Sequence, residues 1–502
     1  MSLRIYNTLS RQKELFSPVV PGKVGIYLCG PTVYKPPHMG HMVGPVIFDA
    51  VKRYLVYKGF EVTWVVNITD VDDKLIDQAN EEKISMQAVA ERCTKDYLDC
   101  LALLGVDTID KTPKASEHIV EIIAMTTKLI EKGNAYSTDG NVWFDVTKDE
   151  DYGKLANRKP EEQTSGTRAL EGAGKRNPAD FSLWKAAKPG EPSWDSPWGK
   201  GRPGWHIECS AMSNKYLGDT FDIHGGGMDL MFPHHENELA QSECCSGKKF
   251  VNFWMHNGLT RVKTKLASGE WKDEKESKSL GNIRDARQMI SSLGADLVRY
   301  LLLSSHYRSP IETGDEVIAA SRKGLASFQR LFTRVERITG QPLPDKGVDM
   351  DMASRELLDS PALVDFVRNC LNFKMRFLEM MDDDFNTAGA IAVLHELAGA
   401  TNAFIETTSI ERTKHAETLQ AVVAAAQTVK NLGNVLGFFR VRSAAPAEDS
   451  SLTDGLMKLL INLRNEARKS KNFALADEVR NGLTALGITL EDRADGTGWT
   501  RE

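Results

Sequence analysis

Residues 28–42, LCGPTVYKPPHMGHM, place one cysteine close to two histidines. Cys29 follows an apolar run that predicts a short buried strand, and His38 and His41 stand at the start of a predicted helix. A thiolate at the end of a strand can bind a metal, and the N-terminus of a helix favours phosphate. The alternative is that Cys29 is a small core residue and that the histidines cap the helix.

Three more side chains could complete a metal site with Cys29. His234 and Glu238, in FDIHGGGMDLMFPHHENELAQ, are four residues apart at the start of a predicted helix, so they share one face. Cys209, in GWHIECSAMS, also stands at a predicted helix start. Two thiolates, an imidazole and a carboxylate can bind zinc, although no CxxC pair marks this site and separate packing roles remain an alternative. The other cysteines are assigned to packing: Cys93, Cys100, Cys244, Cys245 and Cys370.

Two segments could bind the phosphates of a nucleotide. In the first, Gly40 would let a nucleotide lie against the backbone while His38 and His41 donate hydrogen bonds to phosphate. In the second, DEKESKSLGN, Lys275 and Lys278 lie in a predicted mobile loop before a helix, and Lys278 is a point charge suited to a leaving pyrophosphate. A plain helix cap and a solvated charged turn are the alternatives.

A glycine run could receive the nucleoside. In HGGGMDL, Gly226 and its two glycine neighbours could cradle adenosine, and Asp229 could accept a hydrogen bond from a ribose hydroxyl. Three consecutive glycines could equally form an ordinary turn.

These residues require a scaffold that brings distant segments together. The pattern predicts an α/β fold: a Rossmann-type doubly wound parallel sheet with an insertion, followed by an all-helical C-terminal region and a small terminal unit. In such sheets the ligands bind at the carboxyl ends of the strands. A helix is predicted over 40–57 and a hairpin at Asp139-Gly140, while residues 150–203 show no sustained period. The predicted strands cover 24–28, 61–69, 219–224 and 249–256.

A chain of 502 residues is long enough for about three domains. The predicted boundaries are 1–115 and 204–282 for the catalytic domain, 116–203 for a connective insertion, 283–310 for a linking helical segment, 311–442 for a helical bundle, 443–451 for a linker and 452–502 for a small terminal unit.

The composition is that of an ordinary globular protein, with 41% hydrophobic and 26% charged residues. No uninterrupted apolar run approaches the roughly 18 residues of a membrane helix, and the N-terminus lacks the apolar core of a signal peptide. We therefore expect a cytoplasmic protein without a membrane partner, whose seven cysteines are reduced. The net charge of −6 argues against a generally basic surface but leaves local RNA binding open.

Taken together, the motifs resemble the class I aminoacyl-tRNA synthetases and, within them, the cysteinyl-tRNA synthetase family. The segment His38–His41 resembles the HIGH signature, and Lys275–Ser279 resembles the KMSKS signature. The resemblance spans nearly the whole chain and rests on CGPTVY, NITDVDDK, GWHIECSAM, HGGGMDLMFPHHENE and SKSLGN.

The resemblance implies that cysteine is activated with ATP and Mg²⁺ to cysteinyl-adenylate and transferred to tRNA(Cys) by a monomeric enzyme. It implies one Zn²⁺ per chain, bound by Cys29, Cys209, His234 and Glu238, that selects the thiolate of L-cysteine. The implied catalytic residues are His38, His41, Lys275 and Lys278. Gly40, Gly226, Asp229 and Lys278 would bind ATP, and Thr69 and Trp205 would line the amino-acid pocket unless they are plain core residues.

In the terminal unit, Arg468, Phe473 and Asp477 lie where the family contacts the anticodon. Phe473 replaces the usual tryptophan and keeps a stacking face, although a solvated helix is the alternative. Two further departures are visible: Glu276 replaces the methionine of KMSKS, and the connector over 262–274 is longer and more charged. We expect these two to alter the dynamics of the loop rather than abolish activity.

Two other functions fit some of these motifs. A paralogous ligase that joins cysteine to an amino-sugar inositol shares the core motifs but lacks the terminal unit, which is present here at 452–502. A zinc-stabilised RNA-binding protein without catalytic activity would not need His38, His41, Lys275 and Lys278, and their retention favours an active enzyme.

Overall fold

The computed structural model divides the chain into two compact units, Met1–Val441 and Arg442–Glu502, each of which is described by itself. The structure describes residues 2–158, 174–265, 271–275, 284–440, 450–493 and 496–501.

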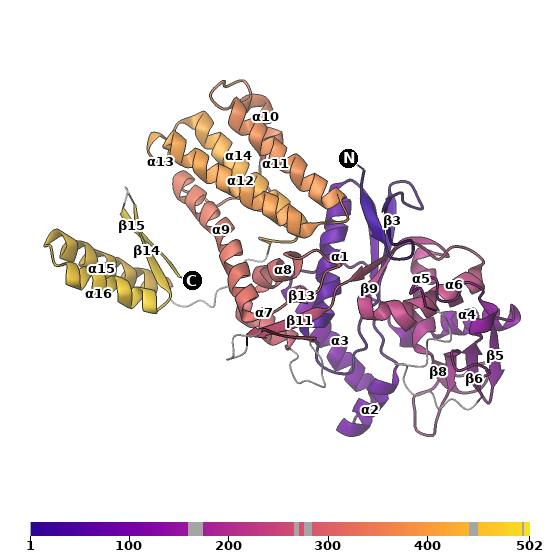
Figure 1. Cartoon of the computed structure of the whole chain (residues 1–502). Helices are drawn as coiled ribbons and strands as arrows, with labels where there is room; N and C mark the ends of the chain where they lie inside the picture. Colours follow the sequence, from indigo (N-terminus) through magenta and orange to yellow (C-terminus); the bar gives the residue numbers. More distant parts are fainter. Residues whose placement is uncertain are drawn as a thin grey trace. The chain divides into compact units, whose positions relative to one another are not determined.

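A four-stranded parallel sheet forms the centre of the first unit (Figure 1). Its strand order is β10–β9–β3–β4, and Ile26 of β3 lies in register with Trp64 of β4 and with Ile223 of β9. Because the strands all run in one direction, their carboxyl ends meet at one edge, as predicted. The strands are β3 (Lys23–Leu28), β4 (Glu61–Val66), β9 (Phe221–Gly227) and β10 (Val251–Asn257).

The helix α1 (Met39–Tyr57) connects β3 to β4 and confirms the helix predicted over 40–57. It is apolar on most of its surface, and 13 of its 19 residues are buried between the sheet and the helices that follow. The chain leaves it through Gly59, whose φ of 92° places this turn in the left-handed region that glycine adopts without strain.

Two strand ends differ from the prediction. β4 stops at Val66 rather than at residue 69, because Ile68 and Thr69 donate their backbone N–H groups to Pro113 and Pro31 instead of to a neighbouring strand of the sheet. β9 continues to Gly227, so the three glycines are part of the strand and not a turn. They pair with residues 255–257 of β10.

The segment between the two halves of this sheet forms an antiparallel sheet of its own, in the order β5–β6–β7–β8. The predicted hairpin at Asp139-Gly140 is confirmed, and both residues have a positive φ. The last two strands lie in the region 150–203, whose sequence shows no sustained period, and β8 has only three residues. The register between β6 and β7 shifts at Val142 and Trp143 of β6. The strands are β5 (Ala135–Thr138), β6 (Asn141–Phe144), β7 (Phe181–Ala186) and β8 (Gly201–Pro203).

Helices and short strands surround the two sheets. Before the insertion lie β1 (Arg4–Asn7), β2 (Gln12–Leu15), α2 (Asp73–Glu82), α3 (Met86–Leu103), the 3₁₀ turn Ala115–Glu117 and α4 (Ile119–Glu131). Within and after it come the 3₁₀ turn Val146–Lys148, α5 (Trp205–Leu217), the short turns Met228–Leu230 and Met231–His235, and α6 (Glu236–Ser246). A further sheet, with three strands, contains β11 (Thr260–Lys265), β12 (Trp271–Lys275) and β13 (Ile311–Glu312).

The rest of the first unit is helical, apart from β13, and its core is continuous with the core around α1. The helices are α7 (Ala286–Leu293), α8 (Ala295–Leu303), α9 (Asp315–Thr339), α10 (Met350–Leu357), α11 (Val364–Asp382), α12 (Thr387–Thr408), α13 (Ile410–Thr413) and α14 (Ala416–Val435). Within the described residues, α12 alone is long and apolar enough to cross a membrane, but it packs against α11 and α14 as a core helix does.

The second unit is a helical hairpin with a two-stranded antiparallel sheet. Met457, Leu483 and Leu490 form its small core. Arg464 is almost fully buried and binds both carboxylate oxygens of Asp492 at 2.7 and 2.6 Å, which joins the first helix to the sheet. Its elements are α15 (Ser450–Lys469), α16 (Phe473–Ala485), β14 (Ile488–Arg493) and β15 (Gly496–Arg501).

Candidate active site

The four predicted metal ligands meet at the carboxyl edge of the parallel sheet. Cys29 directly follows β3, Cys209 lies in the second turn of α5, and His234 and Glu238 flank the start of α6. The two sulfurs are 3.7 Å apart, and each lies 3.6 Å from Nε2 of His234. Oε1 of Glu238 lies 3.3 Å from the sulfur of Cys29 and 2.9 Å from Nε2 of His234. One donor atom from each of the four residues lies within 4.8 Å of all the others.

These separations fit one tetrahedral ion. A zinc ion with Zn–S bonds of about 2.3 Å and Zn–N bonds of about 2.1 Å holds two sulfurs about 3.8 Å apart and a sulfur and a nitrogen about 3.6 Å apart. The sulfur–sulfur and sulfur–nitrogen distances match those edges, while His234 and Glu238 lie at direct hydrogen-bond distance. The donor set, two thiols with an imidazole and a carboxylate, suits zinc.

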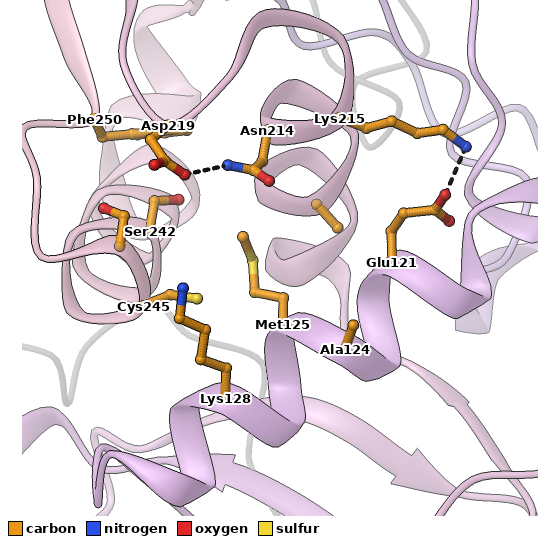
Figure 2. A pocket seen from close by; sticks show the side chains of 12 residues that line it. Glu121, Ala124, Met125, Lys128, Asn214, Lys215, Asp219, Ser242, Cys245 and Phe250 are labelled. Atoms are coloured by element: carbon orange, nitrogen blue, oxygen red, sulfur yellow. Dashed lines mark hydrogen bonds and ion pairs between the residues drawn. The ribbon is translucent and has the colours of Figure 1, made fainter.

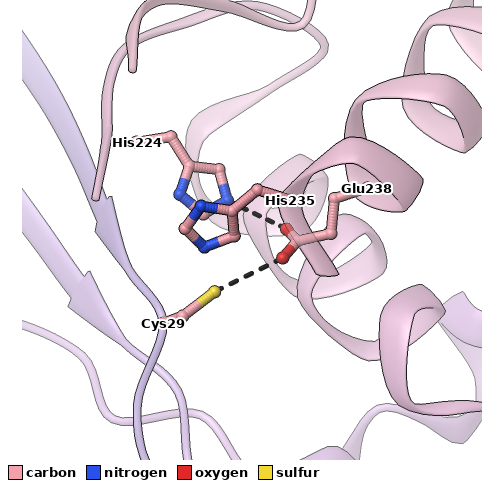
Figure 3. Close-up of side chains that lie close together, drawn as sticks. All are labelled: Cys29, His224, His235 and Glu238. Carbon is pink, nitrogen blue, oxygen red and sulfur yellow. Dashed lines mark hydrogen bonds and ion pairs between the residues drawn. The ribbon is translucent and has the colours of Figure 1, made fainter. Parts of the chain in front are cut away.

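A second group of side chains shares two members of this set (Figure 3). His224, in the middle of β9, and His235, directly before α6, lie near Cys29 and Glu238. Nε2 of His224 is 2.9 Å from Oε2 of Glu238, the carboxylate oxygen that faces away from His234. His235 already shares a 2.8 Å hydrogen bond with His256. This bond uses Nδ1 of His235 and leaves its Nε2 available, so the second group could also hold an ion. With the first group as the ligands, His224 would orient the carboxylate of Glu238.

The electrostatics favour the charged forms of three of the four side chains, whereas burial and the neighbouring Cys209 raise the pKa of the Cys29 thiol well above its usual range. Burial raises the pKa of the Cys209 thiol, but hydrogen bonds with Cys29 and His234 outweigh burial and bring this pKa to about 7. Burial opposes a charge on His234, yet the nearby Glu238 carboxylate raises the pKa of that imidazole to about 10. Burial likewise raises the pKa of Glu238, and the charges of His224 and His234 hold it well below its usual range. A cation would replace these protons as the partner of the thiolates and the carboxylate.

Two aromatic side chains of α5 flank His234. The indole of Trp205 stacks on its imidazole, with ring centroids 4.1 Å apart. Nδ1 of His206 lies 3.0 Å from Nδ1 of His234, on the side away from the sulfurs. The resemblance predicts Trp205 as a pocket residue, whereas the sequence does not single out His206, His224 or His235. Their proximity in sequence to Cys209 and His234 was the available signal.

The segment that carries His38 pairs with residues that follow the predicted lysine segment. The backbone of residues 37–39 pairs with residues 284–286, the segment that leads into α7: the N–H of Met39 donates to Arg284, and that of Ala286 donates to Pro37. Nδ1 of His41 accepts a 3.4 Å hydrogen bond from the N–H of His38, and the two imidazole centroids are 3.8 Å apart. The predicted helix cap is therefore present, and it sets the two half-buried rings side by side at the N-terminus of α1.

Only part of the lysine segment belongs to the described residues. Lys275 is the last residue of β12 and its backbone pairs with Arg261 of β11, so 273–275 are strand and not loop as predicted. The described parts of the connector, 262–265 and 271–274, lie in the antiparallel strands β11 and β12. Lys278 and Glu276 lie outside the described residues.

The glycines near the site have different structural reasons. A Cβ on Gly226 would come within 2.6 Å of the His235 ring, so this glycine makes room for a histidine beside the metal centre. A Cβ on Gly40 would meet the His38 ring at 2.9 Å. Asp229 is exposed in the turn that follows β9.

Thr69 lies in the loop after β4 and is 1% exposed. Its hydroxyl accepts a 3.3 Å hydrogen bond from the side-chain amide of Asn67, and its backbone pairs with the loop that follows Cys29. Thr69 is thus buried close to the cluster.

Comparisons with known proteins agree with this arrangement. The model of the tRNA synthetases class I (C) catalytic domain matches residues 15–323. Cysteine–tRNA ligases of Heliobacterium modesticaldum and Thermococcus onnurineus are 46% and 43% identical to this chain. The first alignment covers 100% of both chains, and the second covers 100% of this chain and 99% of the relative. The chain belongs to the cysteine–tRNA ligase family.

More distant class I synthetases share the fold of this cysteine–tRNA ligase family member. The structure of Mycobacterium tuberculosis methionyl-tRNA synthetase bound by methionyl-adenylate superposes with a TM-score of 0.58 at 15% identity, over 82% of this chain and 90% of that one. The model of the DALR domain matches residues 376–440, the end of the helical region of the first unit. The predicted fold class is thus confirmed.

Within this family member, the predicted anticodon residues lie on the second unit. Phe473 begins α16 and is 60% exposed. Arg468 is half-exposed and binds Asp492 at 2.8 Å, so part of its charge is neutralised within the unit. Asp477 lies in α16, one turn after Phe473.

The cysteines assigned to packing lie apart from the metal centre. Cys93, Cys100, Cys245 and Cys370 are buried, and Cys244 is half-buried. Cys245 lines a cavity of about 290 Å³ between α4, α5 and α6 that contains none of the predicted site residues (Figure 2). Ser242 of α6 lines the same cavity, toward the C-terminal end of the helix that carries Glu238 at its start.

Proposed function

We propose that this chain is a cysteine–tRNA ligase that selects the thiol of its substrate at a zinc ion bound by Cys29, Cys209, His234 and Glu238. The observation that carries the proposal is the convergence of these four side chains, from three parts of the sequence, at separations that fit one tetrahedral ion. Membership of the ligase family supplies the reaction, and the cluster supplies the selectivity.

Cysteine and serine have nearly the same shape, so a pocket that reads shape alone discriminates poorly between them. A zinc ion bound there would supply a soft Lewis acid that prefers a thiolate to a hydroxyl. Trp205 keeps His234 in place by stacking on it, and His224 holds the second oxygen of Glu238, so the ligand geometry is fixed before the substrate arrives. Thr69 and Trp205 would line the remainder of the amino-acid pocket.

The activation step belongs to the N-terminus of α1. The carboxylate of cysteine attacks the α-phosphorus of ATP, and the bond to pyrophosphate breaks to leave cysteinyl-adenylate. His38 and His41, side by side at this helix end, would stabilise the charge on the phosphate, with Mg²⁺ bound to ATP. Gly40, Gly226 and Asp229 would contact the nucleotide, and Lys275 and Lys278 would stabilise the leaving pyrophosphate.

The cysteinyl group then passes to the 3′-terminal adenosine of tRNA(Cys). A DALR domain and the exposed ring of Phe473 support RNA binding by the helical region and by the second unit. Arg468 and Asp477 would contact the anticodon beside Phe473. We propose that the enzyme acts as a cytoplasmic monomer and needs no membrane.

Cysteine-dependent ATP–pyrophosphate exchange, followed by charging of tRNA(Cys), tests the proposal. The parent chain should exchange with cysteine, reject serine and contain one zinc per chain. Lys278→Ala should lower the exchange rate about a hundredfold, the typical effect of removing one charged contact of the transition state. An active, metal-free chain would contradict the role of the cluster, and exchange without tRNA charging would contradict the ligase assignment.

A further inference from the structure

The helices α5 and α6 carry Cys209 and Glu238, two of the four candidate metal ligands, and His234 lies two residues before α6 begins. A buried polar cluster joins the two helices just behind these ligands. The cluster consists of Ser210 of α5 with Gln241 and Ser242 of α6. Ser210 and Gln241 are fully buried, and Ser242 is 4% exposed. Buried hydroxyl and amide groups cost free energy unless they are hydrogen-bonded, so their partners show what they hold together.

Ser210 is the centre of the cluster. Its hydroxyl accepts hydrogen bonds from Nε2 of Gln241 at 2.6 Å and from Oγ of Ser242 at 2.8 Å. It donates to the backbone carbonyl of Glu238 at 3.3 Å. One hydroxyl therefore makes three contacts with α6, and one of these contacts is with a candidate metal ligand.

Gln241 makes a second connection between the same helices. Its Nε2 also donates to the carbonyl oxygen of His206, in the first turn of α5, at 2.7 Å. The ring of His206 faces His234 at 3.0 Å. The amide thus links α6 to the start of α5. In the sequence of α5, His206 precedes Cys209 and Ser210 follows it, so α6 is bound on both sides of Cys209.

Apolar residues would pack two helices at lower cost. Oε1 of Gln241 is buried without a hydrogen-bond partner among the described residues, which is a penalty that a packing role alone does not require. The hydrogen bonds are directional, and each ends within three residues of a candidate ligand. They fix the position of Cys209 relative to His234 and Glu238 along and around the helix axes.

We propose that Ser210 and Gln241 are positioning residues of the metal centre, which set the separation between Cys209 and the pair His234–Glu238 and thereby its affinity for zinc. The inference rests on the metal site proposed above. Neither side chain touches the substrate, so their effect acts through the geometry of the ligands. Loss of comparable partners behind metal ligands typically lowers metal affinity by about 10- to 100-fold.

The test compares Ser210→Ala with Ser213→Ala in the full chain. Ser213 is equally buried on the same helix, but its hydroxyl donates to the carbonyl of Ser210 and so stays within α5. Zinc affinity is measured by competition with a chromophoric chelator. We expect Ser210→Ala to bind zinc about 10- to 100-fold more weakly than the parent, and Ser213→Ala to stay within about twofold.

Gln241→Glu provides a second variant in case Ser210→Ala folds poorly. It keeps the size of the side chain but replaces the donor that binds His206 and Ser210 with an acceptor, so it should weaken zinc binding as well. With Co²⁺ in place of zinc, Ser210→Ala and Gln241→Glu should shift and weaken the ligand-field bands of a tetrahedral ion, whereas Ser213→Ala should preserve them.

Equal zinc affinities and identical Co²⁺ spectra for the parent, Ser210→Ala and Ser213→Ala would overturn this inference while leaving the metal site intact. A parent chain that binds no zinc would overturn the metal site itself and the inference with it. The two failures are therefore distinguishable.

Discussion

The metal centre and the N-terminus of α1 lie at the same edge of the parallel sheet but are held in different ways. The ligands of the metal centre are almost fully buried apart from Cys29, and buried hydrogen bonds support them from several sides. His38 and His41 are half-buried and rest on a helix cap and on backbone pairing with residues 284–286. The first site therefore depends on packed elements, while the second depends on a contact between segments about 250 residues apart.

Because the two sites are held differently, amino-acid selection and activation can be disturbed separately. Under the proposed function, a change at the candidate metal centre should alter which amino acid is accepted, because the bound ion would select sulfur. A change at the N-terminus of α1 should slow activation of every amino acid that binds, since phosphate charge is handled there. Metal content and exchange rate, measured together, distinguish an effect on one site from an effect on the other.

The largest effect is expected for Cys209→Ala. It removes one of two thiolates from a four-ligand site, so the chain should lose stoichiometric zinc and the cysteine-over-serine preference should collapse. Cysteine-dependent exchange should fall at least about a thousandfold, because one lost contact already costs about a hundredfold and the site loses its ion. Metal analysis and exchange with each amino acid check this.

Cys245→Ala is the matched control, since Cys245 is buried in α6 but lies apart from the cluster. It should retain zinc and selectivity. If Cys209→Ala keeps its zinc and its preference for cysteine over serine, amino-acid selection does not depend on the candidate metal centre.

The next effect concerns the support of α1 rather than its histidines. Asp49, in the middle of α1, binds Arg299 of α8 at 2.7 Å, and both side chains are 0% exposed. Asp49→Asn leaves the guanidinium with a weaker buried partner, so we expect a loss of about 3 to 5 kcal/mol in the free energy of unfolding. Urea unfolding measures this loss, and zinc content at low urea should be unchanged.

An exposed aspartate serves as the control for Asp49. Asp99 pairs with Lys95 on the surface of α3, and Asp99→Asn should shift the unfolding free energy by less than about 0.5 kcal/mol. Equal losses for the two variants would show that the buried pair does not anchor α1.

His41→Ala should then lower cysteine-dependent exchange about a hundredfold while the zinc content stays at that of the parent. The reason is that His41 can contact phosphate but no candidate metal ligand. The lost cap on the His38 N–H should cost about 1 kcal/mol of stability, which thermal unfolding reports separately. His415→Ala, at the exposed N-cap of α14, should change neither the exchange rate nor the zinc content. Loss of zinc in His41→Ala would show that the two sites are not independent.

The sequence singles out the candidate metal ligands more readily than the residues that support them. His234 and Glu238 can be paired because a helix places residues four apart on one face. Cys29 and Cys209 are candidates from their predicted positions at a strand end and a helix start, and the resemblance to a known family joins all four into one set. His224 has no such spacing to Glu238, since the contact depends on how β9 lies against α6. Sequence spacing reports contacts within an element, whereas contacts between elements depend on packing.

The fold shows the same limit. The parallel sheet and α1 were predictable from their apolar runs, but β8 of the antiparallel sheet was not, because it has only three residues and begins with glycine and ends with proline. The three glycines of β9 suggested a turn from composition alone. Pairing with β10 and the space that His235 requires explain why they are strand.

The smallest effect concerns a contact that neither site shares, between α2 and the antiparallel sheet. Asp73 of α2 binds Lys185 at 2.7 Å and also binds Arg202. Burial raises the pKa of Asp73, but these two cations outweigh burial and lower it to about 2. A lowered carboxyl pKa stabilises the fold above the ordinary value near 4, and this stabilisation is lost as the pH falls toward 2.

Asp73→Asn should therefore lower the free energy of unfolding at pH 7 by less than about 1 kcal/mol, since the side chain is 40% exposed and solvent screens the pair. The difference from the parent should shrink between about pH 4 and pH 2, where Asp73 becomes protonated in both states. Asp77→Asn, one turn further along α2, is the control and should leave the pH profile unchanged. A difference in unfolding free energy between parent and Asp73→Asn that persists at pH 2 would show that packing, and not charge, joins α2 to the antiparallel sheet. This contact would then depend on buried packing, as the candidate metal centre does.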